Sequence, residues 1–444
     1  MDEKEAKFEA GCTQHEFDIE KSATGPAQAL AKSINFLDGI SLVLGALIGA
    51  GFFVTPGLLF QTVGPFGALL AWLLGSIIAL TGALCYSELS TFLVSAGSES
   101  TYLSKAFGEV AGFSYVLMLF LVVGTGGVAA VSNVSATYIV NGIGYNSAES
   151  GTMVQIVTIA LVVALTLLNL GGTSHAVILQ RILLVAKVVT VIGVIGACVI
   201  HRITVPDLPS ALENNFMDGF DASRLVDAFI AVLFAFNGFQ FLAPMTEEML
   251  NPSRDVLLSF FVSCRVSHPS LPNEPLRLTS SILIALCAAG SANFKLIGCS
   301  RIFYGAARDD GFLPSSLTYI SSRNVPVVSI IVTAVWTVLI LVVVPDLSDI
   351  LKYFMTGQIM VFALVGCALM RLRSTMPNAE RAYKVSLYPL TPIVFISSCL
   401  AIIIYSVSMS ETPGTARWSL ILSFTGVPVY FLANYIRKTY NARK

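Results

Sequence analysis

The chain has 444 residues, of which 55% are hydrophobic and only 12% are charged, and its formal net charge is −1. A soluble domain is about 25% charged, so this composition excludes an ordinary soluble protein, and the near-neutral charge gives no reason to expect a nucleic-acid partner. Apolar runs of about 20 residues recur along the whole length and leave no room for a separate soluble domain. We therefore expect one membrane domain, surrounded by membrane lipid.

The eight cysteines and four histidines give no sign of metal or cofactor chemistry. No CxxC pair and no HExxH motif occurs, and nearly all the cysteines lie inside apolar runs, where they serve as small buried residues. We expect no metal, no cofactor and no enzymatic activity.

Residues 1–34 are polar and mixed in charge. They lack the basic region followed by a short apolar stretch that marks a cleaved signal, so we expect a cytosolic N-terminal tail. The transmembrane domain is predicted over residues 35–436, and residues 437–444 form a short cytosolic C-terminal tail.

Eleven clear apolar spans make up this domain. Each is predicted to be helical, because lipid offers backbone N–H and C=O groups no partner outside their own helix. The spans lie near residues 39–60, 65–92, 109–141, 152–170, 179–200, 223–246, 278–305, 325–344, 349–370, 388–408 and 416–436.

The basic residues test this count, because Lys and Arg gather in cytoplasmic loops. The loops near 61–64, 142–151 and 345–348 have none, and the alternation places both termini in the cytosol. Both termini on one side require an even number of crossings, nominally twelve. Residues 256–277 are therefore predicted to be a truncated seventh span, much of which is too polar for hydrocarbon.

Three glycines, Gly45, Gly49 and Gly51, interrupt the first span, and Pro56 follows them. These residues weaken a helix, and unwound backbone at mid-membrane is tolerated only where it is buried in protein or lines a cavity. The N–H groups of the second half-helix then form a positive end suited to a carboxylate. The alternative is a GxxxG surface on which helices pack closely; we favour the broken helix.

The sixth span has a second interruption around Phe234 to Gln240, and it holds the polar residues Asn237 and Gln240. Two broken helices five spans apart are what an inverted repeat places at one central site. The alternative for the sixth span alone is a kinked packing helix rich in phenylalanine.

An amino acid head group fits these two interruptions, with its carboxylate on backbone N–H groups and its ammonium on backbone carbonyls. The N–H groups are those near Ala50, Gly51 and Phe52, and the carbonyls are those near Leu47, Ile48, Phe234 and Ala235. Neither interruption contains a charged residue, so we expect a charged substrate side chain to find no counter-ion and a neutral amino acid to fit best. Gln358 in the tenth span is a further polar residue for this pocket.

Two lysines lie within apolar spans, Lys187 in the fifth and Lys295 in the eighth, if the truncated span is counted. An intramembrane lysine is costly enough to indicate function, and the alternative is that its side chain reaches out to an interface. For Lys187 we favour function, whereas for Lys295 the two interpretations are equal.

The sequence resembles the L-type amino acid transporter family of the amino acid-polyamine-organocation superfamily, from about Asn35 to Tyr430. The stretches that carry the resemblance are IGAGFFVTP at 48–56, GALCYSEL at 82–89, FAFNG at 234–238, TEEMLNP at 246–252 and GVPVY at 426–430. Several motifs in the right order make the resemblance specific.

The resemblance implies the all-α membrane fold shared with bacterial leucine transporters, which has two inverted five-helix repeats followed by two C-terminal helices. It also implies alternating access, with Gly49, Ala50 and Gly51 on the substrate carboxylate and Phe234 as the gating aromatic. Lys187 matches the lysine that stands where sodium-coupled relatives bind an ion. The expected activity is sodium-independent exchange of large neutral amino acids in the plasma membrane.

Four departures from the family pattern limit this inference. Ala50 replaces a serine, and residues 124–127 (Gly-Thr-Gly-Gly) replace a bulkier third-helix segment and are expected to widen the pocket. The loop 141–151 lacks the cysteine that joins some members to a heavy-chain glycoprotein, so no disulfide to such a partner is expected. About one helix is missing after Arg254. A non-transporting truncated or splice form, and a proton-coupled symporter, stay open as alternatives.

Overall fold

The structure of the chain is a computed structural model. It describes residues 50–95, 98–145, 150–172, 224–238, 274–308, 313–323, 325–344, 346–408 and 413–441, together with single positions in 178–196 and 217–240. The chain divides into Met1–Lys32, which lies outside these residues, and Ser33–Lys444, to which everything below refers.

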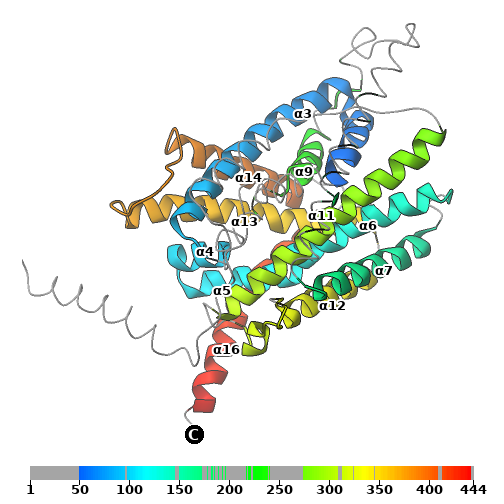
Figure 1. Cartoon of the computed structure of the whole chain (residues 1–444). Helices are drawn as coiled ribbons and strands as arrows, with labels where there is room; N and C mark the ends of the chain where they lie inside the picture. The colour runs from blue at the N-terminus through cyan, green and yellow to red at the C-terminus, as the bar shows by residue number, and fades with distance from the viewer. Residues whose placement is uncertain are drawn as a thin grey trace, which may run out of the picture. The chain divides into compact units, whose positions relative to one another are not determined.

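The described part of the chain is helical, with no strand among its residues. The elements in Figure 1 are α3 (Ala50–Phe92), α4 (Glu99–Phe107), α5 (Glu109–Met118), the π-helix η1 (Leu119–Val123), α6 (Gly124–Gly142), α7 (Gly151–Leu170), α9 (Leu225–Ala235), α11 (Glu274–Arg308), the 3-10 helix η4 (Ser315–Thr318), α12 (Val327–Val343), α13 (Leu347–Thr375), α14 (Leu390–Ser408), α15 (Pro413–Phe424) and α16 (Gly426–Asn441).

Six helical segments in the described ranges are long and apolar enough to cross a membrane, which makes this an integral membrane protein. They are Thr62–Phe92, Glu109–Gly142, Gly151–Leu170, Ser281–Arg308, Asp349–Thr375 and Leu390–Ser408, and each overlaps a predicted span. The shorter apolar helix Val327–Val343 matches the predicted span 325–344. Most of the predicted spans 179–200 and 256–277 lies outside the described residues.

Two boundaries differ from the prediction. The first two spans are joined without a loop, because α3 runs through residues 61–64 and departs from helical geometry only at Gly64, with φ 69° and ψ 178°. Glycine adopts that left-handed φ without strain, so one residue replaces the expected loop. The last predicted span, 416–436, is wrong as a single helix, because a turn at Thr425 separates α15 from α16.

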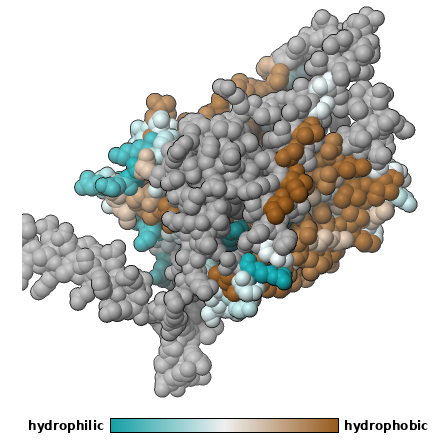
Figure 2. Space-filling view, in the orientation of Figure 1, coloured by the Kyte–Doolittle hydropathy of each residue, from teal (hydrophilic) through white to brown (hydrophobic). Residues whose placement is uncertain are grey.

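Helix packing places α6 at the centre of this unit. Figure 1 shows α6, α7, α11 and α12 running side by side, and contacts join α6 to each of the other three. On the other side of the unit α3 packs against α9, and α13 contacts both α3 and α6. Apolar side chains cover the outer face over α7 and α12 in Figure 2, as a lipid-facing surface requires.

Candidate functional site

Helix α9 ends at Ala235, where the sequence predicts the second interruption. The backbone then turns over Phe236, Asn237 and Gly238, and the N–H of Asn237 donates to the carbonyl of Phe234 at 3.2 Å. Carbonyls in the last turn of a helix lose their regular partners and carry partial negative charge. The end of α9 is therefore a place where a cationic group is stabilised.

Gly51 of α3 lies directly against this end of α9. A methyl group at Gly51 would be 2.6 Å from the Cα of Ala235 and 3.1 Å from the ring atom Cδ1 of Phe234. Only a glycine allows two backbones to approach so closely. The structure therefore brings Gly51, at the described start of α3, against the interruption of the sixth span at the end of α9. The break predicted in the first span lies mainly before Ala50, outside the described residues, and stays a prediction.

Phe234 connects this contact to α13. Its side chain is buried, and its ring meets the ring of Phe354 edge to face, with centroids 6.4 Å apart. Phe354 in turn fills the space beside α6, because a methyl group at Gly127 would lie 3.0 Å from its ring. Phe354 therefore occupies part of the room that the glycines at 124–127 leave, and the expectation that they widen the pocket stays a prediction.

Lys295 of α11 also reaches the region where α3, α9 and α13 meet. Its Nζ donates to Oδ1 of Asn237 at 2.7 Å and lies 5.1 Å from the centroid of the Phe354 ring. Gln240 completes the pair predicted from the sequence, because its Nε2 donates to the same Oδ1 at 3.1 Å and its Oε1 accepts from the N–H of Gly238 at 3.1 Å.

This arrangement corrects two sequence-based expectations. Lys295 is only 4% exposed, so the interpretation that its side chain reaches out to an interface is wrong. A lysine also stands beside the second interruption, although no charged residue lies within it, so the argument that a charged substrate would find no counter-ion there does not hold for an acidic substrate side chain. The charge comes from a residue 58 positions away along the chain.

The structure describes the remaining predicted residues to different extents. Gln358 is 2% exposed and lies one helical turn beyond Phe354 on α13. Ala50 and Phe52 belong to α3, but their side chains lie outside what the structure describes. Leu47, Ile48, Gly49 and Lys187 also lie outside the described residues, so their roles stay predictions.

The third helix contains a feature that the sequence analysis missed. Residues Leu119–Val123 form a π-helix directly before the glycine-rich segment, and the hydroxyl of Thr125 donates to the carbonyl of Phe120 at 2.7 Å. Such π-turns inside α-helices are frequent at functional sites. A wider turn has no side-chain signature of its own, and only the run of glycines after it marked this segment.

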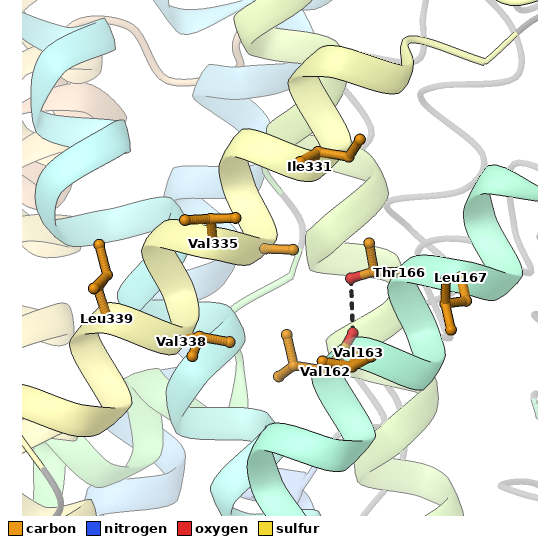
Figure 3. A pocket seen from close by; sticks show the side chains of 9 residues that line it. Val162, Val163, Thr166, Leu167, Ile331, Val335, Val338 and Leu339 are labelled. Atoms are coloured by element: carbon orange, nitrogen blue, oxygen red, sulfur yellow. Dashed lines mark hydrogen bonds between the residues drawn. The ribbon is translucent and has the colours of Figure 1, made fainter.

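An apolar groove on the outer face lies between α7 and α12 (Figure 3) and has a volume of about 320 Å³. Its one hydroxyl, on Thr166, already donates to the carbonyl of Val162 at 2.7 Å. A charged head group has no partner among the nine lining residues, so the groove suits a lipid acyl chain better than an amino acid. The described residues also hold no cluster of three metal-ligating side chains.

Comparison with known proteins identifies the family. The family described as "Amino acid permease" matches residues 34–265 and 276–431, and the ten residues left out fall in the polar segment predicted to be a truncated span. The human "Cystine/glutamate transporter" is 26% identical over 91% of this chain and 85% of its own length.

Two further relatives match at a similar level. The rabbit (Oryctolagus cuniculus) "Large neutral amino acids transporter small subunit 2" is 26% identical over 97% of this chain and 85% of its own length. The mouse (Mus musculus) "Asc-type amino acid transporter 1" is 25% identical over 92% of this chain and 82% of its own length. The expectations of a transporter rather than an enzyme, and of the transporter fold, are confirmed. The chain belongs to the amino acid permease family.

Proposed function

We propose that this chain is a sodium-independent amino acid exchanger that works by alternating access at the junction of α3 and α9. The observation that carries the proposal is the contact between Gly51 and Ala235, which places the first span, whose break is predicted beside Gly51, against the observed end of α9. Such a junction offers backbone polar groups to a ligand within an otherwise apolar domain.

The head group of the substrate has a complementary place on each side of this junction. Its carboxylate is proposed to accept from N–H groups near Ala50, Gly51 and Phe52, where the sequence predicts that the second half of the broken first span begins. Its ammonium is proposed to lie on the carbonyls of Phe234 and Ala235 at the end of α9, together with those of Leu47 and Ile48. Helix dipoles favour both placements.

Sodium independence rests on the resemblance of Lys187 to the fifth-helix lysine that replaces an ion. A location in the plasma membrane with both termini in the cytosol, the boundaries at residues 34/35 and 436/437, and a heavy-chain partner held without a disulfide from the loop 141–151 belong to the same proposal.

The side chain of the substrate needs a separate argument. The names of the relatives include a large-neutral amino acid transporter and a cystine/glutamate transporter, so both neutral and acidic substrates occur among them. The expectation of a large neutral substrate for this chain relied on the absence of charge at the interruptions. Lys295 removes that premise, so the proposed function covers amino acids as a class.

The test is uptake into liposomes that hold the purified protein. Labelled leucine and labelled glutamate are supplied outside, in sodium or choline medium, to liposomes that are either preloaded with the same unlabelled amino acid or empty. We expect uptake of at least one of them that depends on preloading and is equal in the two media. Uptake that needs sodium, or uptake equal in empty and preloaded liposomes, contradicts the proposal.

A further inference from the structure

The amide of Asn237 has a fixed orientation in this site. An ammonium is a donor only, so the Asn237 atom 2.7 Å from Nζ of Lys295 must be the oxygen, and Gln240 donates to that same oxygen. The amide nitrogen Nδ2 therefore lies on the other side of the group. Asn237 is only 3% exposed, and Nδ2 has no hydrogen-bond partner among the residues that the structure describes.

A buried amide N–H without an acceptor is rare in folded proteins and costs stability, because the group loses water and gains nothing. The acceptor of Asn237 is already used by two donors. What the Asn237–Lys295 pair can still offer a ligand is therefore donation from Nδ2, next to a buried positive charge.

The location of the pair links it to the proposed substrate site. Asn237 follows two residues after Ala235, which contacts Gly51. Lys295 lies over Phe354, whose ring contacts Phe234. The pair therefore lies at the interruption after α9, two residues from the contact with Gly51, among the residues that would surround a bound amino acid.

The ligand group that matches a buried amide donor and an ammonium is a carboxylate, because charge-assisted hydrogen bonds to it are the strongest available. An aliphatic side chain would leave Nδ2 without an acceptor, and a cationic side chain would be repelled by Lys295 in a medium of low dielectric constant. The chemistry of the pair thus discriminates among amino acids by the charge of their side chains.

We propose that Nδ2 of Asn237 and Nζ of Lys295 form a subsite for the side-chain carboxylate of an acidic amino acid. This inference rests on the proposed function and names its substrate class. Asn237 is then the specificity-determining residue that contacts the substrate, and Lys295 both holds its amide in place and supplies the charge.

The test is preloading-driven uptake of labelled glutamate, leucine and lysine by the wild type, by Asn237→Asp and by Lys295→Met. Asn237→Asp is nearly isosteric and keeps an oxygen for Lys295 and Gln240, but it replaces the donor with a carboxylate oxygen. Lys384→Met, which removes an exposed loop lysine, is the matched control for Lys295→Met.

We expect the wild type to prefer glutamate to leucine and to exclude lysine. Asn237→Asp is expected to lower glutamate uptake at least about 10-fold, which corresponds to about 1.4 kcal/mol, and to lower leucine uptake by a smaller factor. Lys295→Met is expected to invert the preference towards leucine, and Lys384→Met to match the wild type.

The outcomes separate this inference from the proposed function. Exchange of leucine without glutamate by the wild type overturns the acidic subsite and leaves the exchanger intact. Glutamate uptake by Asn237→Asp equal to that of the wild type also overturns it. Exchange of no amino acid at all overturns the proposed function, and the inference with it. If Lys295→Met fails to fold, Asn237→Asp decides alone.

Discussion

Glu99 is a buried carboxyl group outside the membrane-spanning segments. It lies in the first turn of α4 with 3% of its surface exposed, and its Oε2 accepts a hydrogen bond from the hydroxyl of Ser98 at 2.7 Å. Burial raises the pKa of Glu99 above its ordinary value, because the charged form loses hydration that the hydrogen bonds from Ser98 and its other neighbours do not fully replace.

This shift makes the stability of the protein depend on pH in a defined direction. The folded state binds the proton of Glu99 more tightly than the unfolded state, so the free energy of unfolding falls as pH rises from the unfolded pKa through the raised folded pKa. We expect Glu99→Gln to remove this part of the dependence and to raise the melting temperature at pH 7.5. Thermal unfolding of both proteins between pH 5 and pH 8 measures it. A difference between the two melting temperatures that does not grow with pH contradicts the assignment.

An ion-pair cluster fixes the connection between α13 and α14 to the end of α3. Glu88 is fully buried and accepts from Nε of Arg373 at 2.8 Å and from the N–H of Val385 at 2.7 Å, and Nε of Arg381 lies 3.2 Å from its Oε1. The two guanidinium groups also stack on aromatic rings, Arg373 on Tyr388 and Arg381 on Phe92. The connection is therefore held by charge as well as by packing.

Removing the charge of Glu88 is expected to destabilise this element. Glu88→Gln leaves two buried or partly buried guanidinium groups without their carboxylate, which costs towards the lower end of about 3–5 kcal/mol because Arg373 retains some exposure. The control is Glu109→Gln, since Glu109 is exposed and accepts a single bond from the hydroxyl of Tyr430. Urea or thermal unfolding in detergent compares them, and equal stabilities of the two variants would refute this role.

At the scale of the whole molecule, periodicity and composition predict the membrane helices well. Spans are set by the thickness of the lipid and by the need to satisfy backbone groups within each helix, so the limits of α7, α12 and α14 follow the predicted ranges closely. Two boundaries were wrong for local reasons, because a glycine at 64 turns the chain in one residue and a turn at Thr425 divides an apolar run.

The candidate site was only partly predictable. Gly51 and Asn237 were found because a glycine run and a polar residue interrupt apolar spans, and such local irregularity is visible in a sequence. The contact of Asn237, two residues beyond α9, with Lys295 of α11 joins residues 58 positions apart, and no local pattern in the sequence marks it. The sequence alone does not tell which residues come into contact. It therefore could not decide whether Lys295 is functional or extends its side chain to the membrane interface.

The central claim is that amino acids bind where Gly51 meets Ala235, and a pair of glycine variants tests it most directly. Gly51→Ala places a methyl group 2.6 Å from the Cα of Ala235, whereas a methyl group at Gly151 on α7 meets nothing within 4 Å. The measurement is preloading-driven amino acid uptake at equal amounts of folded, inserted protein. We expect Gly51→Ala to lower uptake at least about 10-fold through overpacking of the junction, and Gly151→Ala to match the wild type. Equal uptake by the two variants would contradict the account.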